Sequence, residues 1–507
     1  MTVSVTRVLR AFWLLAICML LMAGCTWLES LPLNLPGIST ATPEPAPIPS
    51  ATSTSAGPLQ TPNATAVAPT DPGEATPPQG TQPLVLQLWV PDFLNPDADT
   101  AVGAALSEQV SSFVGVAQNV QVQMVAKSDT GTGSLYSLIS TAYAVAPSIL
   151  PDVVVMNQHD IIAAADVGLL QSLSSALPPD AGFFPTALSV VTTDKGVWAF
   201  PYVARAEHMA YAVGAVPVVE ATPLVEGTPT VESTRTTEVV PTATDAAAAP
   251  TILPLSWTDV ISGNYQMLFP SGPADGLAGD ALLSIYLGSG GRVMDQNGLP
   301  TLDRASLERV YSFFGAMRDS ALLDAEVALS LPDAAACWAL YQTGVGELTP
   351  VPAGLYWQSL IAQASAGEAA SETTLTRQTL PSWPPTVTGD PITILKVWGL
   401  AVVTQDPARR EAALGLVRWL VSAQHMADVA YAAALVPTRR TAIETWPIDP
   451  EAATVLNSLL TNGVSALPPT VDGPARRALQ AGLTALLQQD VDSAAAAASL
   501  ALTTLRR

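Results

Sequence analysis

Residues 151–156 read Pro-Asp-Val-Val-Val-Met, and Asn-Gln-His-Asp follows at 157–160. The short apolar run Val153–Met156 is typical of a buried strand. A helical pattern then continues to Gly168, a residue that suits the left-handed end of a helix. A buried strand followed at once by a helix is the unit of a parallel α/β sheet that has helices on both faces.

The same alternation of strands and helices extends in both directions. Residues 84–90 and 120–125 alternate as strands do. The apolar spacing after Asp303 predicts a helix, Asp406-Pro407 predicts a helix start, and the tail from Pro474 is Ala- and Leu-rich and helical. So much α/β pattern in one chain of 507 residues suggests two lobes.

Composition excludes some classes of partner. The chain carries 43 Asp+Glu against 21 Lys+Arg, a net charge of −22, and such a surface repels nucleic acid. Its cysteines are Cys18, Cys25 and Cys337. We expect Cys337 to be a buried core thiol, because its neighbours form an apolar helical pattern.

The N-terminus has the features of an export signal. Arg7 and Arg10 precede the apolar run Ala11–Gly24, which is shorter than the roughly 20 residues that a membrane span needs. Small residues then precede Cys25, and this arrangement resembles the bacterial lipobox. We therefore expect a lipoprotein signal peptide at 1–24, a lipidated Cys25, and an extracytoplasmic protein anchored to the cell membrane. A plain signal peptide is the alternative.

Two tracts lack the apolar periodicity of folded sequence. Residues 25–82 are rich in Pro, Thr and Ser, and we expect a disordered stalk there. Residues 218–252 have the same character, and we expect a disordered insertion on a surface loop.

Motifs for catalysis are missing from the sequence. The three histidines, His159, His208 and His425, have no metal-ligand spacing, and there is no nucleophile elbow or P-loop. We expect no catalytic residues, no metal and no cofactor. Carboxylates are plentiful, so counting alone leaves a glycosidase pair open.

Several phrases, taken in order, resemble the family 1 extracellular solute-binding proteins, the receptors of carbohydrate-type ABC importers. The phrases are Leu88-Trp89, the run 151–156 with Gly168-Leu169-Leu170, 197–202, Trp257-Thr258-Asp259, Gly290-Gly291, 344–347, 398–401 and 435–440. The resemblance implies a two-lobed α/β fold of the periplasmic-binding-protein type (type II), with hinge crossings that join the lobes. Lobe 1 would comprise 83–200 and 398–437, and lobe 2 would comprise 201–397 and 438–507. It also implies a monomer that binds a small solute, such as a sugar, between the lobes and docks on ABC permease subunits.

Loops at the carboxyl ends of strands are expected to carry the ligand-binding groups. The first strand is followed by Asp92, and the strand 153–156 is followed by Asn157, Gln158, His159 and Asp160. Asn157 and Asp160 could equally cap the following helix, and His159 could be a solvated loop residue.

The resemblance adds further candidates. It suggests ligand contacts by Tyr202 and Arg205 where the chain first crosses between lobes, by Tyr356 and Trp357 after the Gly344 turn, and by Trp398 at the return crossing. Arg205 could instead pair with Glu207. Trp338 and Trp419 fall on apolar helix faces and are expected in the core.

Three functions remain open on the sequence. The first is a lipid-anchored receptor that captures a sugar or oligosaccharide for an ABC importer. The second is a surface binding or sensory lipoprotein of the same fold without transport. The third is a secreted glycoside hydrolase.

Overall fold

The computed structural model describes residues 83–506, with gaps at 118, 132, 177, 179–180, 213–254 and 367–378. Predictions for the signal peptide, Cys25 and the stalk lie outside the described residues, as does the predicted insertion at 218–252. Within the described ranges, no helix has both the length and the apolarity that crossing a membrane requires.

A seven-stranded sheet, the first sheet, combines strands from the N-terminal and C-terminal parts of the described chain. Its strand order is β11-β6-β10-β3-β1-β2, and β12 pairs with β10 beyond that path. The strands are β1 (Leu84–Pro91), β2 (Val120–Lys127), β3 (Val153–Asn157), β6 (Phe200–Arg205), β10 (Ile394–Val402), β11 (Val436–Pro437) and β12 (Val464–Ser465). The strands predicted at 84–90, 120–125 and 153–156 are thus confirmed.

The register of the first sheet brings several strand ends to one edge. β1 pairs in parallel with β2 up to Pro91↔Lys127 and with β3 at Leu88↔Val153. β10 runs antiparallel to β3, so that Trp398 lies opposite Asn157, the last residue of β3. We call this the site edge. β6 also ends here at Arg205, opposite Lys396 of β10, and only Ala206 separates it from β7.

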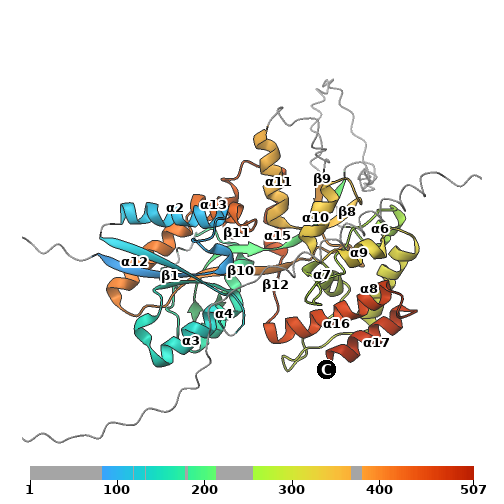
Figure 1. Cartoon of the computed structure of the whole chain (residues 1–507), viewed down its shortest axis with the longest axis horizontal. Helices are drawn as coiled ribbons and strands as arrows, with labels where there is room; N and C mark the ends of the chain where they lie inside the picture. Colours follow the sequence, from blue (N-terminus) through green and yellow to red (C-terminus); the bar gives the residue numbers. More distant parts are fainter. Residues whose placement is uncertain are drawn as a thin grey trace, which may run out of the picture. The chain divides into compact units, whose positions relative to one another are not determined.

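Helices cover both faces of the first sheet (Figure 1). One face packs against α2 (Ala101–Val116), α12 (Pro407–Leu420) and α13 (Ala423–Ala432). The other face packs against α3 (Leu135–Val145) and α4 (Gln158–Asp166). Further elements complete this part: η1 (Asp92–Leu94), η2 (Pro147–Ile149), α5 (Pro185–Ser189), β4 (Thr192–Thr193), β5 (Gly196–Val197), α14 (Arg440–Ile443) and α15 (Pro450–Asn462).

A three-stranded antiparallel sheet, the second sheet, has the order β8-β7-β9. It consists of β7 (Glu207–Ala212), β8 (Leu348–Pro352) and β9 (Thr379–Ser382). The helices of this part are α6 (Trp257–Ser262), α7 (Asp280–Gly288), α8 (Arg304–Asp319), α9 (Ala325–Ser330), α10 (Ala334–Gln342), α11 (Ala353–Ala366), α16 (Pro469–Leu487) and α17 (Ala494–Leu505). Among these, α8, α16 and α17 pack together around a second core cluster.

Local sequence signals explain where several helices begin and end. Asn157 caps α4, and Gly168 follows the end of that helix with φ of +76°, as predicted. Asp406 caps α12 and Pro407 occupies its first turn. Ser256 and Asp259 form a capping box at α6. Cys337 lies fully buried in α10, as expected, and burial raises the pKa of its thiol.

The mixed α/β architecture confirms the predicted fold class. The limits of the two predicted lobes remain predictions. Two contacts bear on these limits. β6, which crosses the predicted limit at 200/201, stays in the first sheet up to Arg205. α15, predicted for lobe 2, contacts α5 of predicted lobe 1 through a bond from Thr186 Oγ1 to the Leu460 carbonyl.

Candidate functional site

Four side chains from four different segments meet at the site edge. Asp129 follows β2, Asn157 ends β3, Asp160 lies in the first turn of α4, and Trp398 lies in β10. The Trp398 indole N–H donates to Asp129 Oδ2 at 3.2 Å. Asn157 Nδ2 donates to Asp160 Oδ2 at 2.9 Å and to Asp129 Oδ1 at 3.5 Å. We call Asp129, Asn157, Asp160 and Trp398 the acidic cluster.

Asn157 has two roles in this arrangement. Its Oδ1 accepts the backbone N–H groups of His159 and Asp160, each at 3.1 Å, and so caps α4. Its amide nitrogen then remains to hold both carboxylates of the acidic cluster. Asn157 therefore caps α4, as one of the two sequence-based interpretations predicted, and the same cap fixes the position of Asp160.

Two neighbours surround the Trp398 ring, which is 6% exposed. Phe93, just after β1, meets it edge-on at a centroid distance of 5.1 Å. The guanidinium of Arg205 lies 5.9 Å from the ring centroid, a cation–π arrangement. No ion pair joins Arg205 to Glu207 in the described part of the chain; instead Glu207 Oε2 accepts the backbone N–H of Ala281 at 3.0 Å.

Burial alters the titration of Asp160 in the cluster and of His159 beside it. It raises the pKa of the Asp160 carboxyl to about 6; the bond from Asn157 opposes this rise, and the charge of Asp129 adds to it. Burial lowers the pKa of His159, while the Ala466 backbone and Asp472 act in the opposite direction. His159 thus lies near the segment after β12.

The cluster suits an uncharged, hydroxyl-rich ligand. Asp129 and Asp160 supply carboxylate acceptors that Asn157 and Trp398 hold in place, and the half-buried Phe93 ring supplies aromatic surface. In the described residues, no group of three His, Cys, Asp or Glu side chains could hold a metal ion.

The structure buries other predicted site residues away from this cluster. Tyr202, Tyr356 and Trp357 are at most 2% exposed and belong to the hydrophobic core. Gly354, beside them in α11, packs so tightly that an added Cβ would lie 1.9 Å from the Ala434 carbonyl oxygen. This close packing holds the start of α11 against the segment after α13, and the burial of all three rings leaves no surface on which a solute could stack.

Two more predicted residues have different positions. Asp92 is exposed at the start of η1, one residue before Phe93. Gln158 is 3% exposed, and its amide is fully engaged by other parts of the chain, so it is not free to contact a solute. Sequence reasoning missed Asp129 and Phe93. Asp129 follows the end of a predicted strand, so the rule that selected Asn157 could also have selected it.

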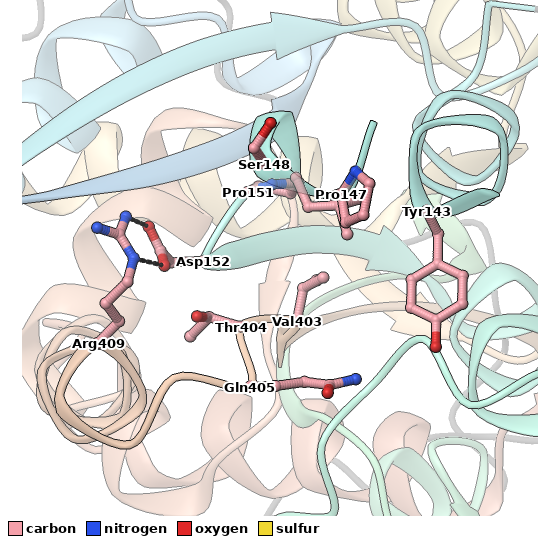
Figure 2. Close-up of a pocket in the computed structure, with 10 residues that line it drawn as sticks. Tyr143, Pro147, Ser148, Pro151, Asp152, Val403, Thr404, Gln405 and Arg409 are labelled. Carbon is pink, nitrogen blue, oxygen red and sulfur yellow. Dashed lines mark hydrogen bonds and ion pairs between the residues drawn. The ribbon is translucent and has the colours of Figure 1, made fainter. Parts of the chain in front are cut away.

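A cavity of about 760 Å³ lies at the opposite edge of the first sheet, where β3 begins and β10 ends. Figure 2 shows Tyr143, Pro147, Thr404 and Gln405 around it, with Arg409 bound to Asp152 at one side. Arg409 Nε donates to Asp152 Oδ1 at 2.7 Å, and Asp152 Oδ2 accepts the N–H of Gln87 at 2.8 Å. The charged groups of this cavity thus satisfy one another and join α12 to β1 and β3.

Comparison with known proteins relates the chain to solved structures alone. No protein-family model and no curated protein sequence matches it. An extracellular solute-binding protein family 1 from Alicyclobacillus acidocaldarius is similar with a TM-score of 0.58 and 15% identity, over 84% of this chain and 98% of that one.

Two similar structures contain sugars. Maltose-bound MalE3 of T. maritima matches with a TM-score of 0.55 and 15% identity, over 83% of this chain and 99% of that chain. The maltose/maltodextrin-binding domain MalE from Bdellovibrio bacteriovorus, bound to maltotriose, matches with a TM-score of 0.52, 15% identity and the same coverage. All three are binding proteins. The likeness across these structures shows that the chain has the two-lobed α/β fold of the periplasmic solute-binding proteins.

Proposed function

We propose that this chain is an extracytoplasmic receptor that binds a sugar or short oligosaccharide at the acidic cluster. The observation that carries the proposal is the cluster's position. It lies at the sheet edge where β6 leaves for the second sheet, in a fold shared with proteins whose structures contain bound maltose and maltotriose. Carboxylate and amide groups beside aromatic rings are the chemistry that recognises sugar hydroxyls and C–H faces.

A binding screen tests this function. Maltose, maltotriose, glucose and galactose are each titrated into the purified full chain by calorimetry, with thermal unfolding in parallel. A sugar that binds the folded state alone should raise the melting temperature with increasing concentration. Asp160→Ala should abolish that rise, whereas Glu308→Ala, which removes an exposed carboxylate of α8, should preserve it. Absence of binding across a broad sugar panel would refute the proposal.

The same screen separates binding from catalysis. Chromatography of each sugar after long incubation with the protein should recover it unchanged, because the proposed receptor does not turn over its ligand. Hydrolysis that Asp129→Asn or Asp160→Asn abolishes would instead favour the glycoside hydrolase alternative.

We further propose that Cys25 is lipidated and anchors the receptor to the cell membrane, where it delivers its solute to an ABC importer. The arginines, apolar run and small residues before Cys25 support the anchor. Mass spectrometry of the mature N-terminus should find an acylated Cys25, and Cys25→Ser should release the protein from membranes. Sugar uptake that depends on neighbouring permease genes would favour transport, whereas their absence beside a kinase gene would favour the sensory alternative.

A further inference from the structure

Three segments of the chain pass between the two sheets, and hydrogen bonds join them. The first is the β6–β7 junction at Ala206, the second is Thr393 at the start of β10, and the third is the β12 segment that leads to α16. Thr393 Oγ1 donates to the Glu207 carbonyl, and the Thr393 carbonyl accepts the N–H of Val464 at 2.8 Å. The Ala466 N–H also donates to the Leu395 carbonyl at 3.0 Å.

Gln158 binds two of these segments with one side chain. Its Oε1 accepts the N–H of Val397 in β10 at 2.9 Å. Its Nε2 donates to Ser465 Oγ at 2.8 Å and to the Ala466 carbonyl at 3.3 Å. Both amide N–H groups and the oxygen are therefore used. Since Gln158 is 3% exposed, water cannot readily replace these partners.

Gln158 is also next to the acidic cluster, both along its own segment and through its partner in β10. Asn157 precedes it, Asp160 follows two residues later, and Trp398 follows its partner Val397. Asn157 and Trp398 lie opposite each other in the sheet register. A ligand that displaces the first turn of α4 or the Trp398 strand would thus act directly on the Gln158 amide.

We propose that Gln158 is a positioning residue that couples occupancy of the acidic cluster to the second and third crossing segments. It does not touch the ligand. It holds the β10 and β12 segments against the N-terminus of α4, so ligand contacts at Asn157, Asp160 or Trp398 alter the geometry of the connection between the sheets. The coupling to ligand rests on the proposed function, whereas the positioning role of Gln158 does not.

Hydrogen exchange by mass spectrometry on the full chain tests the proposal. Gln158→Met keeps the length of the side chain and removes its three hydrogen bonds. Without ligand, we expect at least tenfold faster exchange in peptides that cover 395–398 and 464–467. Gln480→Met is the matched control, because this 4% exposed glutamine of α16 loses bonds to the Ser271 carbonyl and Thr484 instead. It should leave exchange in both segments unchanged.

A second variant separates the two crossing segments. Gln158→Glu keeps an acceptor for the Val397 N–H and loses the amide donors. We expect faster exchange at 464–467 and near-normal exchange at 395–398. If both Gln158 variants exchange like the wild type in these peptides, the positioning role is refuted, whether or not any sugar binds.

The ligand-bound arm uses maltotriose as the probe. In the wild type, maltotriose should slow exchange at 464–467. Gln158→Met should abolish this slowing and weaken maltotriose binding at least tenfold. Gln480→Met should retain the slowing and the wild-type affinity. Unchanged maltotriose protection in Gln158→Met would refute the coupling. If maltotriose does not bind the wild type, that result counts against the proposed function, and the ligand-free exchange still decides the role of Gln158.

Discussion

The indole N–H of Trp398 donates to Asp129 Oδ2 at 3.2 Å, although 269 residues separate the two in the chain. The bond joins the return strand β10 to the loop after β2. It also orients Asp129 toward Asn157, which holds Asp160 in turn. One tryptophan thus fixes the acceptors of the acidic cluster.

Trp398→Phe should weaken sugar binding while the fold is retained. The substitution preserves an aromatic ring and removes the indole donor, so Asp129 loses a partner. Because a hydrogen bond to a charged group contributes about 1.5–3 kcal/mol, we expect affinity to fall roughly 10- to 100-fold. Calorimetric titration measures the change. Trp419→Phe, which removes an indole bond to the Gln109 carbonyl, is the control and should bind normally.

Sugar affinity should depend on pH near the pKa of Asp160, about 6. This pKa lies above the usual value, so the carboxylate acceptor is present above pH 6 and becomes protonated below it. Affinity should therefore fall as pH decreases from 7 to 5. Titrations of Asp160→Asn should be flat across that range. An equal pH dependence in the variant would show that another group is responsible.

Acid should destabilise the fold through His208. This residue is 1% exposed, and burial lowers its pKa to about 4. Since the unfolded chain binds the proton near pH 6.5, stability is full above that pH and decreases as pH falls toward 4, by roughly 3 kcal/mol. Urea unfolding measured between pH 7 and 4 should show this loss.

His208→Phe provides the comparison for that measurement. The histidine ring lies edge-on to Tyr356 at a centroid distance of 4.8 Å, so a phenylalanine ring suits the space. The variant should lose less stability than the wild type over the same pH range. Parallel pH profiles for the two proteins would contradict the assignment to His208.

Arg409→Met should destabilise the chain strongly. The substitution leaves the Asp152 carboxylate, 2% exposed, without its ion-pair partner. Because the Arg409 side chain is 34% exposed and Asp152 keeps the Gln87 N–H, we expect a loss of about 1–3 kcal/mol. Arg304→Met breaks the exposed pair with Glu308 and should cost at most about 1 kcal/mol. Equal free energies of unfolding for the two variants would show that the Asp152–Arg409 pair contributes no more than the exposed pair.

More of the fold than of the candidate site could be predicted from the sequence. Strands such as Val153–Asn157 and caps such as Asp406 depend on neighbouring residues, which one sequence displays. Trp357 is fully buried, and Gly354, three residues before it, contacts the Ala434 segment, so its surroundings come from distant parts of the chain. The local sequence around an aromatic residue after a turn therefore does not distinguish a ring that faces a solute from one that lies in the core.

Polar residues were ambiguous for a related reason. Asn157 and Gln158 are adjacent and similar in chemistry, and the sequence assigned both to the ligand. In the structure, Asn157 caps α4 and binds two carboxylates, whereas Gln158 is directed to Val397 and Ser465. The difference arises from which face of the strand–helix junction meets β10 and β12, and those strands come from sequence more than 200 residues away.

A crystal structure of the full chain grown with a sugar that binds it would test the central claim most directly. We expect a sugar hydroxyl within hydrogen-bond distance of Asp129 or Asp160, beside the Trp398 ring. A sugar seated elsewhere, such as in the cavity beside Asp152 and Gln405, with the acidic cluster empty, would contradict it.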